Sequence, residues 1–184
     1  VITDANGLAT VEFSSGLANK TNRTATVTAS VPVTGIAPVS QNIVISGTTL
    51  TLDSLVNSLI LNGAAGEDII DVTVKATDSA GDAISNEAIS LTLVGLGAGA
   101  GTADFNGEAG QTNNAAGQVT ITKTTDINGS IAVKIRALTA GTDISLVAQG
   151  VGESKSKTYK IATQAQEFNI IDPATSSADL LIGN

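Results

Sequence analysis

The stretch TDINGSIAVKI, residues 125–135, joins a turn signature to an alternating strand and decides the fold of the chain. Its turn residues are Asp126, Asn128 and Gly129. Asp and Asn side chains bond to nearby main chain, and Gly accepts a positive φ, so this combination is typical of a tight turn. Apolar residues then occupy every second position, which predicts a half-buried β-strand.

The same signature occurs near the start of the chain as TDANGLATVEF, with Asp4, Asn6 and Gly7 as its turn residues. Four further matches follow in the same order in both copies. They pair TATVTAS (24–30) with DISLVAQ (143–149), SQNIVIS (40–46) with SKTYKIA (156–162), LTLDS (50–54) with NIIDP (169–173), and NSLILNG (57–63) with ADLLIGN (178–184). A period of roughly 120 residues predicts a tandem array of similar units.

Composition favours strands and excludes several classes of function. The 184 residues are 42% hydrophobic, yet they include only three Phe, one Tyr and no Trp, so the core must be aliphatic. A net charge of −8 leaves no basic face for nucleic acid or an anionic membrane. The absence of His and Cys removes the usual catalytic triad and all thiol chemistry. We therefore expect no enzyme, no nucleic-acid partner and no direct membrane insertion.

Alternating strands recur along almost the whole chain, and turn signals separate them. No segment carries a sustained apolar stripe with the 3.6-residue period of a helix. Short strands at close spacing with such turns are typical of an antiparallel sandwich. The sequence thus predicts an all-β fold.

Three elements in order resemble the bacterial immunoglobulin-like repeats of group 1, found in invasin- and intimin-type adhesins. They are TVKATDSAGDAISNEAISLTL (73–93), the turn and strand at 125–135, and AGTDISLVA (140–148). The resemblance implies tandem Ig-like antiparallel β-sandwiches, one complete and flanked by partial units. It also implies an extracellular place on the bacterial cell surface, in a rod of spacer repeats that holds a distal binding domain away from the envelope and carries no catalytic residues.

The repeat divides the chain into four parts. We expect residues 1–46 to be the C-terminal half of an Ig-like unit and residues 47–61 to be a linker or extra strands. Residues 62–162 would form the complete unit, and residues 163–184 a linker with the opening strand of a next unit.

Acidic residues are densest at Glu67, Asp68 and Asp71, where a junction between units would lie, and Asp53 is close to them in sequence. Because calcium binds several carboxylate oxygens together, these four residues are a candidate junction calcium site. The alternative is that Asp68 and Asp71 lie on a solvated strand face. Each Asp-x-Asn-Gly turn offers only one carboxylate, which favours a structural role for the turns.

Three functions fit these observations. The first is a stalk segment whose partners are neighbouring repeats. The second is a subunit of a filament or surface layer that adds a strand to its neighbour. Its contact residues would be Phe168, Ile170, Ile171, Leu180, Leu181 and Ile182. The third is a carbohydrate- or receptor-binding module, for which Tyr159 is the candidate aromatic residue. We predict the stalk first and the filament second.

Overall fold

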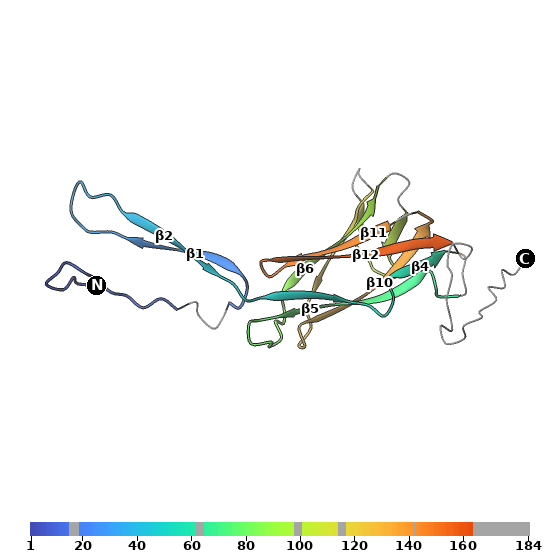
Figure 1. Ribbon diagram of the computed structural model, residues 1–184, viewed down its shortest axis with the longest axis horizontal. Coiled ribbons are helices and arrows are strands. Elements are labelled where there is room, and N and C mark those ends of the chain that lie inside the picture. Colours follow the sequence, from blue (N-terminus) through green and yellow to red (C-terminus); the bar gives the residue numbers. More distant parts are fainter. Residues whose placement is uncertain (15–18, 62–64, 98–100, 114–116, 142, 164–184) are drawn as a thin grey trace, which may run out of the picture.

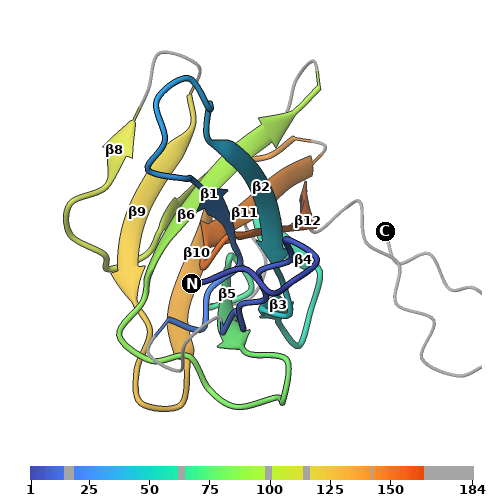
Figure 2. The same cartoon turned by 90° about the vertical axis from the view of Figure 1, so that its left-hand side faces the viewer.

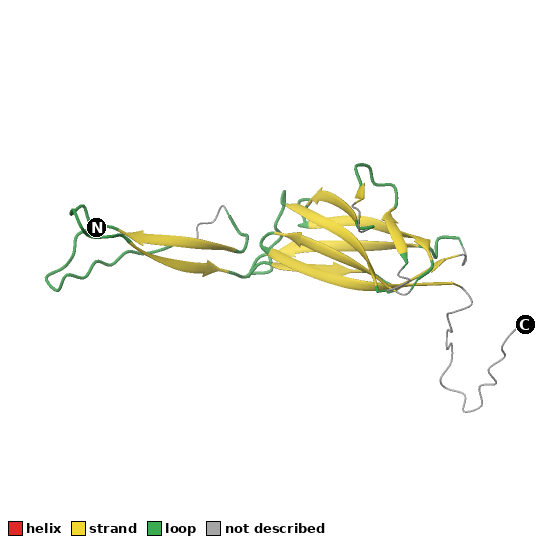
Figure 3. Ribbon diagram, turned by 90° about the horizontal axis from the view of Figure 1, so that it is seen from above, coloured by secondary structure: helices red, strands yellow, loops and turns green. Residues whose placement is uncertain are grey.

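The computed structural model describes residues 1–14, 19–61, 65–97, 101–113, 117–141 and 143–163, and strands are the regular elements there (Figure 3). They are β1 (Arg23–Ala29), β2 (Val39–Ile45), β3 (Thr49–Asp53), β4 (Ser58–Leu61), β5 (Ile69–Thr77), β6 (Ala88–Leu96), β7 (Thr102–Phe105), β8 (Thr112–Asn113), β9 (Val119–Thr124), β10 (Ser130–Thr139), β11 (Asp143–Gly150) and β12 (Glu153–Thr163). The predicted all-β fold is confirmed. Within these ranges no helix is long and apolar enough to cross a membrane.

Ten of the strands form a sandwich of two sheets. One sheet has the order β3-β5-β10-β7 and the other has the order β4-β12-β11-β6-β9-β8. All pairs are antiparallel except β4 and β12, which run parallel. Both strands within residues 47–61 belong to the sandwich, because β3 pairs with β5 in one sheet and β4 pairs with β12 in the other.

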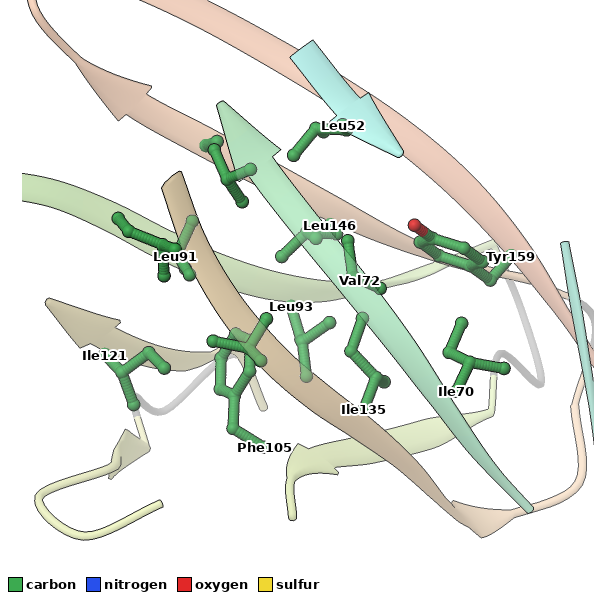
Figure 4. Packing of buried hydrophobic residues seen from close by; sticks show 14 of the residues in the cluster. Leu52, Ile70, Val72, Leu91, Leu93, Phe105, Ile121, Ile135, Leu146 and Tyr159 are labelled. Carbon is green, nitrogen blue, oxygen red and sulfur yellow. The ribbon is translucent and has the colours of Figure 1, made fainter. Parts of the chain in front are cut away.

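The core lies between the two sheets and is almost entirely aliphatic (Figure 4). Period-two alternation places it there: along β5, buried and exposed residues alternate from Ile70 to Ala76, and β10 repeats the pattern. Phe105 and Tyr159 are the two aromatic residues of the core, and both are fully buried. Burial of this apolar surface is the main term that stabilises the sandwich.

The remaining strands, β1 and β2, form a separate two-stranded hairpin that extends from one end of the sandwich along its long axis (Figures 1 and 2). One face of the hairpin is polar apart from Val44, with hydrogen bonds of 2.9 Å between Thr26 and Asn42 and 2.8 Å between Thr28 and Ser40. The opposite face is apolar and only partly covered. It carries Ala25, Val27, Ile43 and Ile45.

Three turns share one geometry, in which the Asp4, Asp78 or Asp126 side chain organises the loop. In each, Oδ1 accepts hydrogen bonds of 2.8–3.0 Å from the main-chain N–H groups two and four residues later. In each, the glycine three residues later donates its N–H to the Asp carbonyl. The Asp therefore satisfies the main-chain donors of the turn, and the glycine supplies the positive φ.

Candidate functional site

A set of hydrogen bonds and an ion pair lies where the hairpin meets the sandwich, and Asn22 makes several of these bonds. The main-chain N–H of Asn22 donates to the carbonyl of Val151 at 3.0 Å. Its side-chain Oδ1 accepts the N–H of Thr48 at 2.9 Å, and its Nδ2 donates to Glu153 Oε1 and to the carbonyl of Thr48. One residue of the N-terminal segment thus bonds to the β11–β12 turn, to β12 and to the segment before β3.

Lys20 adds a charge to this contact. Its ammonium lies 2.7 Å from Asp78 Oδ2, in the turn that follows β5. The hydrogen bond to Asp78 raises the pKa of Lys20, and the same bond lowers the pKa of Asp78. The Lys20 carbonyl also accepts the hydroxyl of Thr48 at 2.8 Å, and Thr48 is buried although it is polar. We call residues 19–22 the docking loop.

The receiving surface includes a strained turn. Val151 and Gly152 join β11 to β12 with φ values of +50° and +75°, a conformation that a β-branched residue rarely adopts. A Cβ built on Gly152 would lie 2.2 Å from the carbonyl oxygen of Asn22. Backbone strain of this kind is often found at functional positions. We define the docking surface as Thr48, Asp78, Val151, Gly152 and Glu153.

The docking loop is also held in shape by its own residues. Arg23 Nη1 donates to the carbonyls of Asn19 and Thr21 at 2.7 and 3.2 Å. Asn19 Oδ1 accepts the main-chain N–H of Thr21 at 3.0 Å and its hydroxyl at 2.7 Å. These bonds hold the docking loop in the conformation that contacts the sandwich, and restraint of this kind lowers the entropy lost on docking.

The four candidate calcium ligands lie apart from this junction and do not form a cluster. The carboxylate of Asp71 pairs with Lys134 Nζ at 2.6 Å, and Asp53 ends β3 opposite Thr73. In the described ranges, no group of three or more acidic residues could hold a metal ion. Glu67 and Asp68 lie in the turn before β5, whereas Asp71 lies within that strand and is exposed. Calcium binding stays a prediction.

Other predicted residues fall in three places. Turn residues Asp4, Asn6 and Gly7 lie in the N-terminal segment, and Asp126, Asn128 and Gly129 lie between β9 and β10. The predicted contact residues Phe168, Ile170, Ile171, Leu180, Leu181 and Ile182 lie outside the described residues. Tyr159 faces the core and is inaccessible, so it cannot supply the exposed aromatic of a binding module.

Sequence reasoning missed the docking loop and the docking surface. The side-chain partners of Asn22 are far away along the chain, 26 residues in the case of Thr48 and 131 in the case of Glu153. One signal was present: the Gly-Val-Gly run at 150–152 places a β-branched residue in a turn where Asn or Gly is usual.

These features define the protein as an antiparallel β-sandwich with a hydrogen-bonded end-to-end junction. No protein-family model and no curated protein matches the chain. A solved structure that it resembles is the adhesin InvE of Yersinia pseudotuberculosis, with 18% sequence identity and a TM-score of 0.45. The match covers 76% of this chain and 40% of the adhesin chain, so this chain corresponds to less than half of that structure.

Proposed function

We propose that this chain is a non-catalytic stalk segment of a bacterial cell-surface adhesin built from tandem Ig-like repeats. The observation that carries the proposal is the N-terminal hairpin, which repeats the last hairpin of the sandwich in sequence, register and facing. A chain in which one unit ends and the next begins at a bonded junction suits a stalk.

The register of the two hairpins coincides position by position. In the sandwich, Ile144 is paired with Tyr159, and the matching residues Ala25 and Ile43 are paired in the N-terminal hairpin. The next inward pair repeats the agreement: Leu146 pairs with Lys157, and Val27 pairs with Gln41. A one-residue slip would turn every side chain to the other face, so this agreement supports a true structural repeat.

The two hairpins differ in what covers them. In the sandwich, β11 pairs with β6, β12 pairs with β4, and their inward residues are buried against the four-stranded sheet. The N-terminal hairpin has neither neighbour, and Ile43 and Ile45 remain partly exposed. An isolated two-stranded hairpin is marginally stable in water. The strands that would cover it are those of a preceding unit, in the positions that β4, β5 and β6 hold in the sandwich.

The mass of the protein in its native source tests this proposal. An antibody raised against this chain would be used on denatured extracts and on intact cells. We expect a band many times larger than 18.3 kDa and labelling of the cell surface without permeabilisation. A native protein of this mass, or one found only inside the cell, would contradict the stalk.

A second candidate function is a subunit of an extracellular filament, and the uncovered edge of β2 favours it. In the sandwich that edge is occupied by β4, with Leu59 beside Ile161. By the sequence repeat, Leu180 of a second copy would take the place of Leu59 beside Ile45. Light scattering would show association of the full chain and its loss on deletion of residues 164–184. A monomer at all concentrations would exclude the filament.

A calcium ion that stiffens a junction also stays part of the proposal, at Glu67, Asp68, Asp71 and Asp53. Titration calorimetry with calcium alone tests it. Heat that disappears in the Asp71→Asn variant is the expected result, and absence of heat in the unmodified chain contradicts the site.

A further inference from the structure

The sandwich has its own counterpart of the docking loop, and the two differ in the residues that would contact the docking surface. Aligned from the following strands, β1 and β11, residues 19–22 (Asn-Lys-Thr-Asn) correspond to residues 138–141 (Leu-Thr-Ala-Gly). The counterpart of Lys20 is therefore Thr139, and the counterpart of Asn22 is Gly141. Neither can make the contact that it replaces, since one lacks the charge and the other lacks a side chain.

The counterpart loop is also committed to its own sandwich. Thr139 Oγ1 accepts the N–H of Thr102 at 3.0 Å and lies 2.8 Å from the Thr102 hydroxyl. The start of β7 packs so closely that a Cβ on Gly101 would lie 2.8 Å from the carbonyl of Thr139. Residues 139–141 are thus held against β7 by their hydrogen bonds and by this close packing.

Loop length separates the two further. Seventeen positions lead from Gly7 to Thr24, and fourteen lead from Gly129 to the matching Asp143. The N-terminal segment therefore has three extra residues between its repeated turn and its hairpin. Extra residues at a surface loop are tolerated at small cost, and here they precede the residues that bind the sandwich.

We infer that the docking surface selects, as its N-terminal neighbour, a unit whose loop presents Lys and Asn two residues apart, and rejects a second copy of this sandwich in that position. This inference rests on the proposed stalk and adds that its units have a fixed order. A neighbour carrying Leu-Thr-Ala-Gly would leave Asp78 without its cation and Glu153 and Thr48 without their amide partner. A neighbour with the wrong loop is then disfavoured, because it leaves these buried or part-buried polar groups without hydrogen-bond partners.

The experiment measures the distance between hairpin and sandwich in the full chain. Because the chain has no Cys, Gln41→Cys and Thr122→Cys give two unique spin labels on exposed positions. Pulsed electron resonance should give a single narrow distance. Replacing residues 19–22 with Leu-Thr-Ala-Gly should abolish that narrow peak. A matched control, Lys134→Thr with Asn106→Gly, makes two of the same changes on the sandwich and should retain it.

A narrow peak at the same distance after the loop replacement would overturn the inference. Slowed hydrogen exchange at Ile43 would verify that the hairpin itself persists in that variant. If the hairpin does not persist in the loop-replacement variant, single substitutions of Lys20 test the inference instead. Lys20→Asp should broaden the distance, whereas Lys20→Arg, which keeps the cation beside Asp78, should retain the narrow peak. A narrow peak in Lys20→Asp would overturn the role of the charge pair in selection.

The stalk and the selective junction can fail separately. A native protein of 18.3 kDa would remove the stalk, while a narrow peak that the loop replacement abolishes would leave the selective surface standing. A giant native protein whose loop replacement changes nothing would leave the stalk and remove the selection.

Discussion

The N–H of Asn22 donates a 3.0 Å hydrogen bond to the carbonyl of Val151, a buried β-branched residue held at a φ of +50°. A left-handed conformation costs an L-residue about 1–2 kcal/mol, so the sandwich keeps a strained turn at the point where the preceding segment binds. Burial of the Val151 side chain in the core offsets this cost. The Val151 side chain therefore packs in the core, while its carbonyl accepts the hydrogen bond from the preceding segment.

Gly152→Ala is expected to release the docking loop while the sandwich stays folded. The new Cβ would collide with Asn22, in addition to the cost of about 1–2 kcal/mol for a side chain at positive φ. Hydrogen exchange at the Asn22 amide should accelerate strongly. Gly107→Ala is the matched control, because its φ is +77°, its Cβ would meet nothing within 4 Å, and it lies outside the docking surface. Equal exchange rates at Asn22 in the two variants would contradict the close contact.

The two copies of the repeated turn should respond differently to the same substitution. A Cβ on Gly129 would lie 2.5 Å from the main-chain oxygen of Ala76, and that backbone cannot move without disturbing β5. We expect Gly129→Ala to lower the free energy of unfolding of the sandwich by more than about 2 kcal/mol, beyond the φ penalty alone. Gly7→Ala meets nothing within 4 Å and should leave urea unfolding of the sandwich unchanged. Similar losses in both variants would refute this environment.

The junction should loosen in acid. The bond to Lys20 holds the pKa of Asp78 below its ordinary value of 3.8, so its stabilisation is present above 3.8 and is lost as pH falls through the lowered pKa. Asp78 raises the pKa of Lys20 above 10.5, so that contribution is present below 10.5 and is lost as pH rises through the raised pKa.

Spin-label distances recorded from neutral pH to below 3.8 check this expectation. The Lys20→Gln variant is the control, since Asp78 then lacks its cation while its bonds to Ala80 and Asp82 remain. The unmodified chain should lose its narrow peak in acid by a step that the control lacks. If the distance distribution of the unmodified chain is equally narrow at neutral pH and below pH 3.8, the Lys20–Asp78 pair does not contribute to the junction.

Tyr159→Phe should leave the sandwich equally stable or make it more stable by about 1 kcal/mol. The Tyr159 hydroxyl is fully buried and has no partner at hydrogen-bond geometry among the described residues. Burial raises its pKa, and the nearby Ser54 hydroxyl offsets only part of that rise. Removing an unpaired buried hydroxyl relieves its desolvation cost, and the ring under Lys157 Nζ is retained. Thermal unfolding measures the change. Tyr159→Leu, which also removes the ring, should destabilise, and a clear loss in Tyr159→Phe would reveal a hidden partner.

Local pattern was enough to predict the strands. Along β10, alternation alone placed Ile131, Val133 and Ile135 in the core, because side-chain direction in a strand depends only on position. The same rule turns Asp71 outward, where it pairs with Lys134 on the neighbouring strand. Period and facing are local properties, and a single sequence contains them.

The sequence pattern does not reveal which strands pair with each other or which loops meet in the fold. Nothing local distinguishes β3, which joins one sheet, from β4, which joins the other five residues later. The bonds of Asn22 depend on where loops from three parts of the fold come together. Such contacts are set by topology, and the sequence expresses them only as single polar residues with no pattern.

In the proposed stalk, the parallel pairing of β4 and β12 determines how tension along the stalk would act on the sandwich. Both strands point away from the hairpin, and β12 ends at the opposite end of the sandwich from the hairpin (Figure 1). Tension along the long axis therefore pulls β4 and β12 past each other along their own length. In the proposed stalk, the ladder from Ser58–Lys160 to Leu61–Thr163 would be loaded in shear, together with the β3–β5 pairs that precede it in the chain.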